Sequence, residues 1–111
     1  MTLAQETCTP CQAGGNPLPG AEAGYLARGV PLWTLAESRI ERNFKFKDFT
    51  AAMAFVNRVA DAANGQGHHP DIFVSYNRVR LTLTTHKIGG LSRNDFILAS
   101  RIDELADVGA P

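Results

Sequence analysis

The chain has 111 residues, enough for one domain that buries roughly two-thirds of the surface exposed by the unfolded chain. Eleven lysines and arginines balance eleven aspartates and glutamates, so the formal net charge is +0 and no overall field attracts nucleic acid or an anionic membrane. Hydrophobic residues make up 44% and charged residues 20%, which is ordinary globular usage rather than the composition of a disordered chain. Composition thus excludes a two-domain enzyme and argues against nucleic acid as a direct partner.

The chain shows no sign of a membrane span or an export signal. No apolar run reaches the ~18 to 20 residues that a membrane span needs. The N-terminus MTLAQETCTPCQ lacks the basic start and apolar stretch of a signal peptide, so we expect a cytoplasmic protein with no membrane partner.

Two cysteines, Cys8 and Cys11, are too few for a disulfide framework. Their spacing is that of half a zinc ribbon or of a redox dithiol, but no second such pair accompanies them. We interpret them as incidental thiols of a flexible arm, with a redox role or a site completed between subunits as the alternatives.

Residues 1–31 hold four of the six prolines and five of the ten glycines, which is typical of loops and turns. We interpret this segment as an N-terminal arm and residues 32–111 as the folded domain. Within the arm, residues 22–28 predict a short helix with Tyr25 and Leu26 as its apolar contacts.

The first strand signal lies in residues 39–47, RIERNFKFK. Ile40, Phe44 and Phe46 occupy even positions while every odd position is polar, a period-two pattern that predicts a half-buried strand. Residues 33–35 are expected to be its antiparallel hairpin partner.

A helix is expected next. Asp48 precedes an alanine-rich stretch with apolar residues at three- and four-residue spacing, which predicts a helix ended by Asn64-Gly65. The expected apolar face consists of Phe49, Met53, Val56, Ala60 and Ala63. A loop would then present His68 and His69.

Two further β-rich runs, residues 72–76 and 79–85, predict a second hairpin joined at Asn77-Arg78. One face of its second strand carries Val79, Leu81 and Leu83.

The last element is predicted to be a helix. Ser92 and Asp95 form a capping-box signature ahead of apolar residues at helical spacing, Phe96, Leu98, Ala99, Ile102 and Leu105. Asp95 either caps this helix or orients a histidine. The whole order, α-β-β-α-β-β-α, predicts an α+β fold in which a four-stranded antiparallel sheet carries helices on one face.

The histidines are the strongest chemical signal. His68 and His69 fall in a loop and His86 at or just past a strand end, positions where catalytic side chains are often displayed. A neutral imidazole with a pKa of about 6.5 can give or take a proton without any cofactor. Pro70 biases His69 towards an extended backbone, so the two neighbouring rings should point in different directions. The alternatives are rings that bond to backbone, or a zinc site, which the absence of HxH or HxxxH spacing disfavours.

The segment GHHPDIFVSYNRVRLTLTTHKIGGLSRNDFILASRID resembles the signature half of the pterin-4a-carbinolamine dehydratases, with a His-His-Pro loop, a Thr-His strand end and an Asp-x-x-Leu-Ala helix at family-like spacing. The resemblance extends upstream and covers about Pro31 to Ile102. The chain departs from many relatives at Ile72, where they carry an aromatic residue, and at the GQG that precedes the histidines.

This resemblance implies a four-stranded α+β fold and dehydration of 4a-hydroxytetrahydropterin to quinonoid dihydropterin, a step of tetrahydrobiopterin recycling. It also implies a homodimer or homotetramer, a pterin substrate, and no metal or organic cofactor. The catalytic residues carried over are His68, His69, His86 and Asp95. The pterin-binding residues carried over are His68, His69, Thr84, Thr85, His86 and Lys87.

The alternative is a catalytically silent dehydratase-like binding module, an assembly factor such as for RuBisCO or a dimerisation cofactor of transcription factors, because one fold can host unrelated functions. The presence of all three histidines favours the enzyme.

Overall fold

The computed structural model describes residues 2–9 and 15–109, and of residues 107–109 the backbone alone. The elements follow in the order η1 (Leu3–Gln5), α1 (Gly20–Ala27), β1 (Thr34–Leu35), β2 (Ile40–Lys45), α2 (Phe49–Gln66), β3 (Asp71–Ser75), β4 (Arg78–Leu83), η2 (His86–Ile88) and α3 (Arg93–Gly109), where η marks a short 3-10 helix. The predicted order of helices and strands is confirmed. Across the described ranges, no helix is both long enough and apolar enough to cross a membrane.

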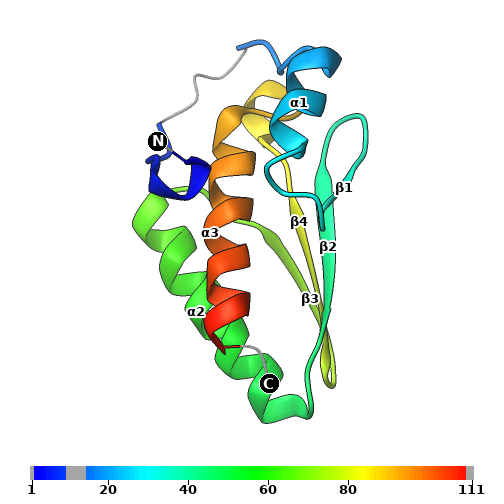
Figure 1. Cartoon of the computed structure of the whole chain (residues 1–111), viewed down its shortest axis with the longest axis vertical. Coiled ribbons are helices and arrows are strands. Elements are labelled where there is room, and N and C mark those ends of the chain that lie inside the picture. The colour runs from blue at the N-terminus through cyan, green and yellow to red at the C-terminus, as the bar shows by residue number, and fades with distance from the viewer. Residues whose placement is uncertain (1, 10–14, 110–111) are drawn as a thin grey trace.

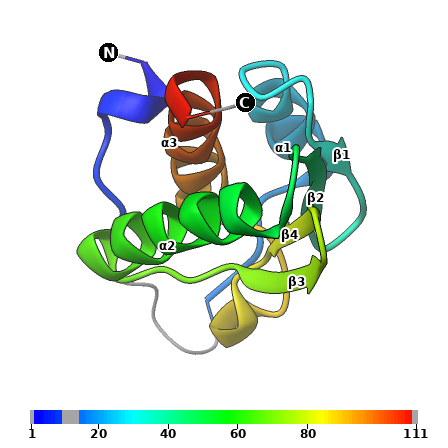
Figure 2. The ribbon, with the colours of Figure 1, turned by 90° about the horizontal axis from the view of Figure 1, so that it is seen from below.

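The four strands form one antiparallel sheet in the order β1-β2-β4-β3 (Figure 1). Helices α2 and α3 lie against one face of this sheet (Figure 2). The face beneath them is apolar, because alternate residues of the two central strands point into it. Its buried side chains are Ile40, Phe44, Val79, Leu81 and Leu83. The predicted α+β class and the period-two patterns are therefore confirmed.

One polar cluster joins the sheet to α3 on this buried side. Asp103 Oδ1 accepts hydrogen bonds from Trp33 Nε1 at 2.8 Å and from Arg42 Nη1 at 2.5 Å. The Arg42 guanidinium also lies 4.3 Å from the centre of the Phe44 ring, so its charge is paired both with the Asp103 carboxylate and with an aromatic face.

Helix α2 begins where it was predicted and ends later. The Asp48 carboxylate accepts the Ala51 N–H at 2.8 Å and caps the first turn. The predicted stop at Asn64-Gly65 is wrong, because the helix continues to Gln66 and ends at Gly67. Gly67 has a φ of 66°, a left-handed conformation that glycine adopts without the steric penalty of a Cβ.

Two predicted apolar faces need correction. The buried residues of α2 are Ala52, Phe55, Val56, Val59 and Ala63, whereas Phe49 is 49% exposed. In α1 the buried residues are Ala23 and Leu26, and Tyr25 is 69% exposed. In an alanine-rich helix, more than one face carries apolar residues three or four positions apart. Packing against the sheet decides which of these faces is buried.

The turn of the second hairpin lies one residue earlier than predicted, at Tyr76-Asn77, since Ser75 pairs with Arg78. Tyr76 has a φ of 52°, as a tight two-residue turn demands. Asn77 donates from Nδ2 to the Phe46 carbonyl at 2.9 Å, and its own carbonyl accepts the Phe46 N–H at 2.8 Å. These two bonds hold the turn against the end of β2.

The corrected face of α2 can be tested by two phenylalanines on the same helix. Phe55 is fully buried, with ring centres 4.8 Å from Phe44 and 5.1 Å from Phe46. We expect Phe55→Ala to lower the free energy of unfolding by about 3 to 5 kcal/mol. The matched Phe49→Ala should cost less than about 1 kcal/mol, because that ring is already half in water. Urea titration measures both, and equal losses would contradict the observed packing.

Candidate active site

A cavity of about 420 Å³ lies where the end of α2, the end of β4 and the start of α3 meet. We call it the histidine cavity. It is lined by Cys8, Thr9, Gln66, Gly67, His68, His69, Thr84, Thr85, His86, Lys87 and Asn94. All three histidines, which are up to eighteen residues apart in the sequence, therefore line one space.

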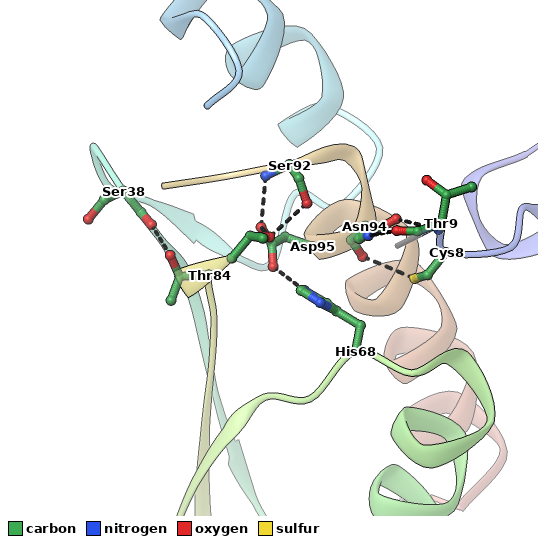
Figure 3. A network of polar contacts seen from close by, with 9 residues as sticks. Cys8, Thr9, Ser38, His68, Thr84, Ser92, Asn94 and Asp95 are labelled. Carbon is green, nitrogen blue, oxygen red and sulfur yellow. Dashed lines mark hydrogen bonds and ion pairs between the residues drawn. The ribbon is translucent and has the colours of Figure 1, made fainter. Parts of the chain in front are cut away.

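His68 is bound to Asp95 at this cavity (Figure 3). Its Nε2 lies 2.5 Å from Asp95 Oδ1, and the aspartate is fully buried. The other carboxylate oxygen, Oδ2, accepts the Ser92 N–H and the Thr85 hydroxyl, each at 2.9 Å. An ionised carboxylate only accepts hydrogen bonds, so Asp95 Oδ1 accepts from the Nε2–H of His68, and the proton-free nitrogen of that ring is Nδ1.

The first turn of α3 explains how Asp95 reaches this position. Its bond to the Ser92 N–H is the half of the predicted capping box that the carboxylate supplies. The Ser92 hydroxyl instead lies 2.7 Å from the Thr85 hydroxyl, whose own proton is donated to Asp95. Asp95 therefore both caps the helix and holds a histidine, the two roles that its sequence position left open.

His69 bonds to a different helix from its neighbour. Its Nε2 lies 3.0 Å from Asn64 Oδ1, near the end of α2, and its side chain is exposed. An amide oxygen only accepts, so this nitrogen carries the proton. The two neighbouring imidazoles therefore bond to different helices, in line with the different directions that Pro70 predicted for them. Both rings bond through Nε2.

His86 and Lys87 reach the cavity from another element, since they open η2, and both are exposed. The segment that carries them is closed by an isolated bridge between Thr85 and Gly90, whose N–H and carbonyl bonds measure 2.9 and 3.4 Å. Thr84 is fixed as well, because its hydroxyl donates to the Ser38 carbonyl at 2.6 Å. A braced loop thus presents an imidazole and an ammonium to the cavity.

Five lining residues were not predicted from the sequence: Cys8, Thr9, Gln66, Gly67 and Asn94. Cys8 and Thr9 belong to the segment interpreted as a flexible arm, yet they contact residues 58 to 86 positions away. Cys11, the partner in the Cys-x-x-Cys spacing, lies outside the described residues. Where residues are described, no three His, Cys, Asp or Glu side chains come together in a group that could hold a metal ion.

The arrangement is suited to proton transfer. Three imidazoles line the cavity, and the oxygens of Asp95 and Asn64 assign the donor nitrogen of His68 and His69 as Nε2. The buried Asp95 carboxylate fixes the orientation of the His68 ring through their 2.5 Å contact. A bound molecule can therefore lose a proton to one imidazole and receive one from another.

Known proteins resemble this chain over nearly its whole length. Residues 16–105 match the family model described as Pterin 4 alpha carbinolamine dehydratase. A provisionally named pterin-4-alpha-carbinolamine dehydratase of Nitrosomonas eutropha is 48% identical over 104 residues, covering 93% of this chain and 92% of its own. The similarly named protein of Rubrobacter xylanophilus is 44% identical over 104 residues, with 93% and 97% coverage.

Solved structures share the fold. A transcriptional coactivator/pterin dehydratase from Brucella melitensis has a TM-score of 0.77 at 35% identity, covering 82% of this chain and 99% of its own. A pterin dehydratase-like protein identified as a RuBisCO assembly factor in the alpha-carboxysome has a TM-score of 0.56 at 23% identity, covering 67% and 86%. The second likeness shows the fold alone.

Proposed function

Because the chain belongs to the pterin-4a-carbinolamine dehydratase family, we propose that it removes water from 4a-hydroxytetrahydropterin and releases quinonoid dihydropterin. The product is the form that a reductase returns to tetrahydropterin after an aromatic amino acid has been hydroxylated. The protein would then be a hydro-lyase in tetrahydrobiopterin recycling.

The reaction needs one proton given and one proton taken. The C4a–O bond breaks as an acid protonates the hydroxyl, which leaves as water. A base removes the N5 proton, and the electrons of the N5–H bond form the C4a=N5 double bond. One imidazole can act as the acid and another as the base, so that after both transfers the protein carries the same number of protons as before.

His69 and His86 are the residues on which we place the proton transfers, since both are exposed at the cavity and are carried by different segments, the loop after α2 and the start of η2. His68 presents Nδ1, because its Nε2 is bound to Asp95. Asp95 is fully buried and does not line the cavity, so it serves as a positioning residue that sets the tautomer of His68.

The observation that carries the proposal is the convergence of these groups. All six residues assigned to pterin contact by resemblance line the same cavity, and Asp95 is bonded to two of them. A volume of about 420 Å³ lies within the range of small-molecule sites. The Lys87 ammonium would donate to the pterin ring, and the Thr84 hydroxyl, whose own proton is donated to the Ser38 carbonyl, would accept from it.

The proposal is tested by the rate at which quinonoid dihydropterin forms from freshly generated 4a-hydroxytetrahydropterin, with and without the protein. We expect acceleration that increases in proportion to protein concentration. If the rate equals the uncatalysed one, the proposal is wrong, and a binding module becomes the better interpretation. Capture of a defined partner by the purified chain would then be the next measurement.

The homodimer or homotetramer implied by the family and the cytoplasmic location stay predictions. Analytical ultracentrifugation of the purified chain measures the first, and fractionation of the native cells measures the second.

A further inference from the structure

A short N-terminal segment, Glu6–Thr9, lies against the start of α3 and the end of α2, beside the histidine cavity. We call it the strap. The Cys8 N–H donates to Gln66 Oε1 at 2.9 Å, and the Cys8 Sγ lies 3.6 Å from the Asn94 carbonyl (Figure 3). Cys8 and Thr9 both line the cavity. Terminal segments are poorly ordered unless bonds to the rest of the fold hold them. These bonds hold the strap at the cavity.

Asn94 makes the most specific attachment. Its Oδ1 accepts the Thr9 N–H at 3.0 Å and its Nδ2 donates to the Thr9 carbonyl at 2.5 Å. The side-chain amide thus pairs with one residue of the strap as a neighbouring strand would pair. Asn94 is only 6% exposed and directly precedes Asp95, so the strap and the His68–Asp95 pair are fixed by adjacent residues of one helical turn.

A second attachment lies outside the cavity, at the other end of the strap. The Glu6 carboxylate accepts two hydrogen bonds of 2.7 Å from Arg93, in the bidentate geometry that such pairs favour. These hydrogen bonds hold the pKa of Glu6 below its ordinary value. Arg101 also donates to the Glu6 carbonyl through Nε and Nη2, at 3.2 and 2.5 Å. Neither Glu6 nor Arg93 lines the histidine cavity.

We propose that the strap is a wall of the pterin-binding cavity, that Asn94 positions it there, and that it acts on substrate affinity rather than on the proton transfers. This inference rests on the proposed function. The strap faces the cavity with Cys8 and Thr9, whereas Thr84, His86 and Lys87 approach from other elements. Ordering the strap costs conformational entropy, and the attachments at both of its ends offset that cost before the substrate arrives.

A charge exchange tests the proposal from outside the cavity. Glu6→Arg and Arg93→Glu each place like charges across the contact, and we expect either to weaken binding of 7,8-dihydrobiopterin about five-fold, with KM rising in parallel and kcat within about two-fold. The double variant Glu6→Arg/Arg93→Glu restores opposite charges and should recover most of the affinity. Arg58→Glu, an exposed change of equal charge on α2, is the matched control.

A change inside the cavity tests the wall directly. Cys8→Phe adds a ring to the wall, and we expect it to bind 7,8-dihydrobiopterin at least ten-fold more weakly than Cys8→Ser, which keeps the size of the side chain. Asn94→Ala should raise KM about ten-fold while kcat falls less. Thermal unfolding of each variant shows whether the fold is retained.

The outcomes separate the two proposals. Suppose that the wild-type chain binds and dehydrates pterin, and that the strap variants bind 7,8-dihydrobiopterin with the wild-type affinity. The strap proposal is then wrong, and the proposed dehydratase activity is retained. The strap proposal is also wrong if the double variant Glu6→Arg/Arg93→Glu unfolds at the wild-type temperature but recovers none of the lost pterin affinity. If the wild-type chain neither binds nor converts pterin, both proposals are wrong.

Discussion

Replacing Asp95 by asparagine is expected to lower kcat/KM by about 10- to 100-fold, because His68 loses the accepting Nδ1 that it offers to the pterin while the proton transfers stay on His69 and His86. The wild-type carboxylate accepts at both oxygens, from His68 at Oδ1 and from Ser92 and Thr85 at Oδ2. Asparagine has one accepting oxygen. The fixed Ser92 N–H would claim that oxygen, which turns the amide NH2 towards His68. The imidazole would then accept through Nε2, carry its proton on Nδ1 and lose the basic nitrogen that it now presents.

Two measurements separate this tautomer change from simple damage. Nitrogen-15 chemical shifts of His68 report which ring nitrogen is protonated, and they should exchange character in Asp95→Asn. Asp103→Asn is the matched control on the same helix, because Asp103 binds Trp33 and Arg42 and does not line the cavity. That variant should lose stability and keep kcat within about two-fold. Full activity in Asp95→Asn would show that the tautomer of His68 does not matter.

Alanine at His69 or at His86 should also lower kcat by about 10²- to 10⁴-fold, if each carries one of the two proton transfers. Both side chains are exposed, so the free energy of unfolding should change by less than about 0.5 kcal/mol. Loss of turnover without loss of stability distinguishes these residues from Asp95, which is fully buried and bonded to three groups.

Added imidazole supplies the decisive readout for this pair. Free imidazole can enter the space that the alanine leaves and transfer protons, so turnover of His69→Ala and His86→Ala should rise with its concentration. The wild-type chain should not respond. Undiminished turnover in His69→Ala would remove that residue from the mechanism, and loss without rescue would point to a binding role instead.

Much of the fold could be predicted from the alternation of apolar and polar residues along short segments. Ile40 and Phe44 predicted the inner face of β2, with the buried Phe46 just past its end, and Val79, Leu81 and Leu83 predicted that of β4. A strand has a period of two, so a one-residue shift would expose the whole set. The buried face of α2 was not predictable in the same way. Alanine satisfies almost any helical stripe, and only contact with Phe44 and Phe46 places Phe55 inwards.

Part of the candidate site could be identified from the sequence, but the contacts between its residues could not. The three histidines and Asp95 were identified by resemblance, because they lie in one recognisable stretch of sequence. The sequence did not show which histidine Asp95 binds, since His68 and Asp95 are 27 residues apart, nor that Thr9 binds Asn94, 85 residues away. Hydrogen bonds at such separations leave no periodic signal in the chain.

The sequence by itself determined the class of fold and the order of its elements, because propensity, capping and side-chain period act over a few neighbouring residues. The acid-base residues that it suggests by resemblance stay a prediction. The tertiary structure decided which nitrogen of His68 is committed to Asp95, which stripe of α2 is buried, and that an N-terminal strap borders the cavity. These are choices among locally equivalent options, and only packing between distant segments distinguishes them.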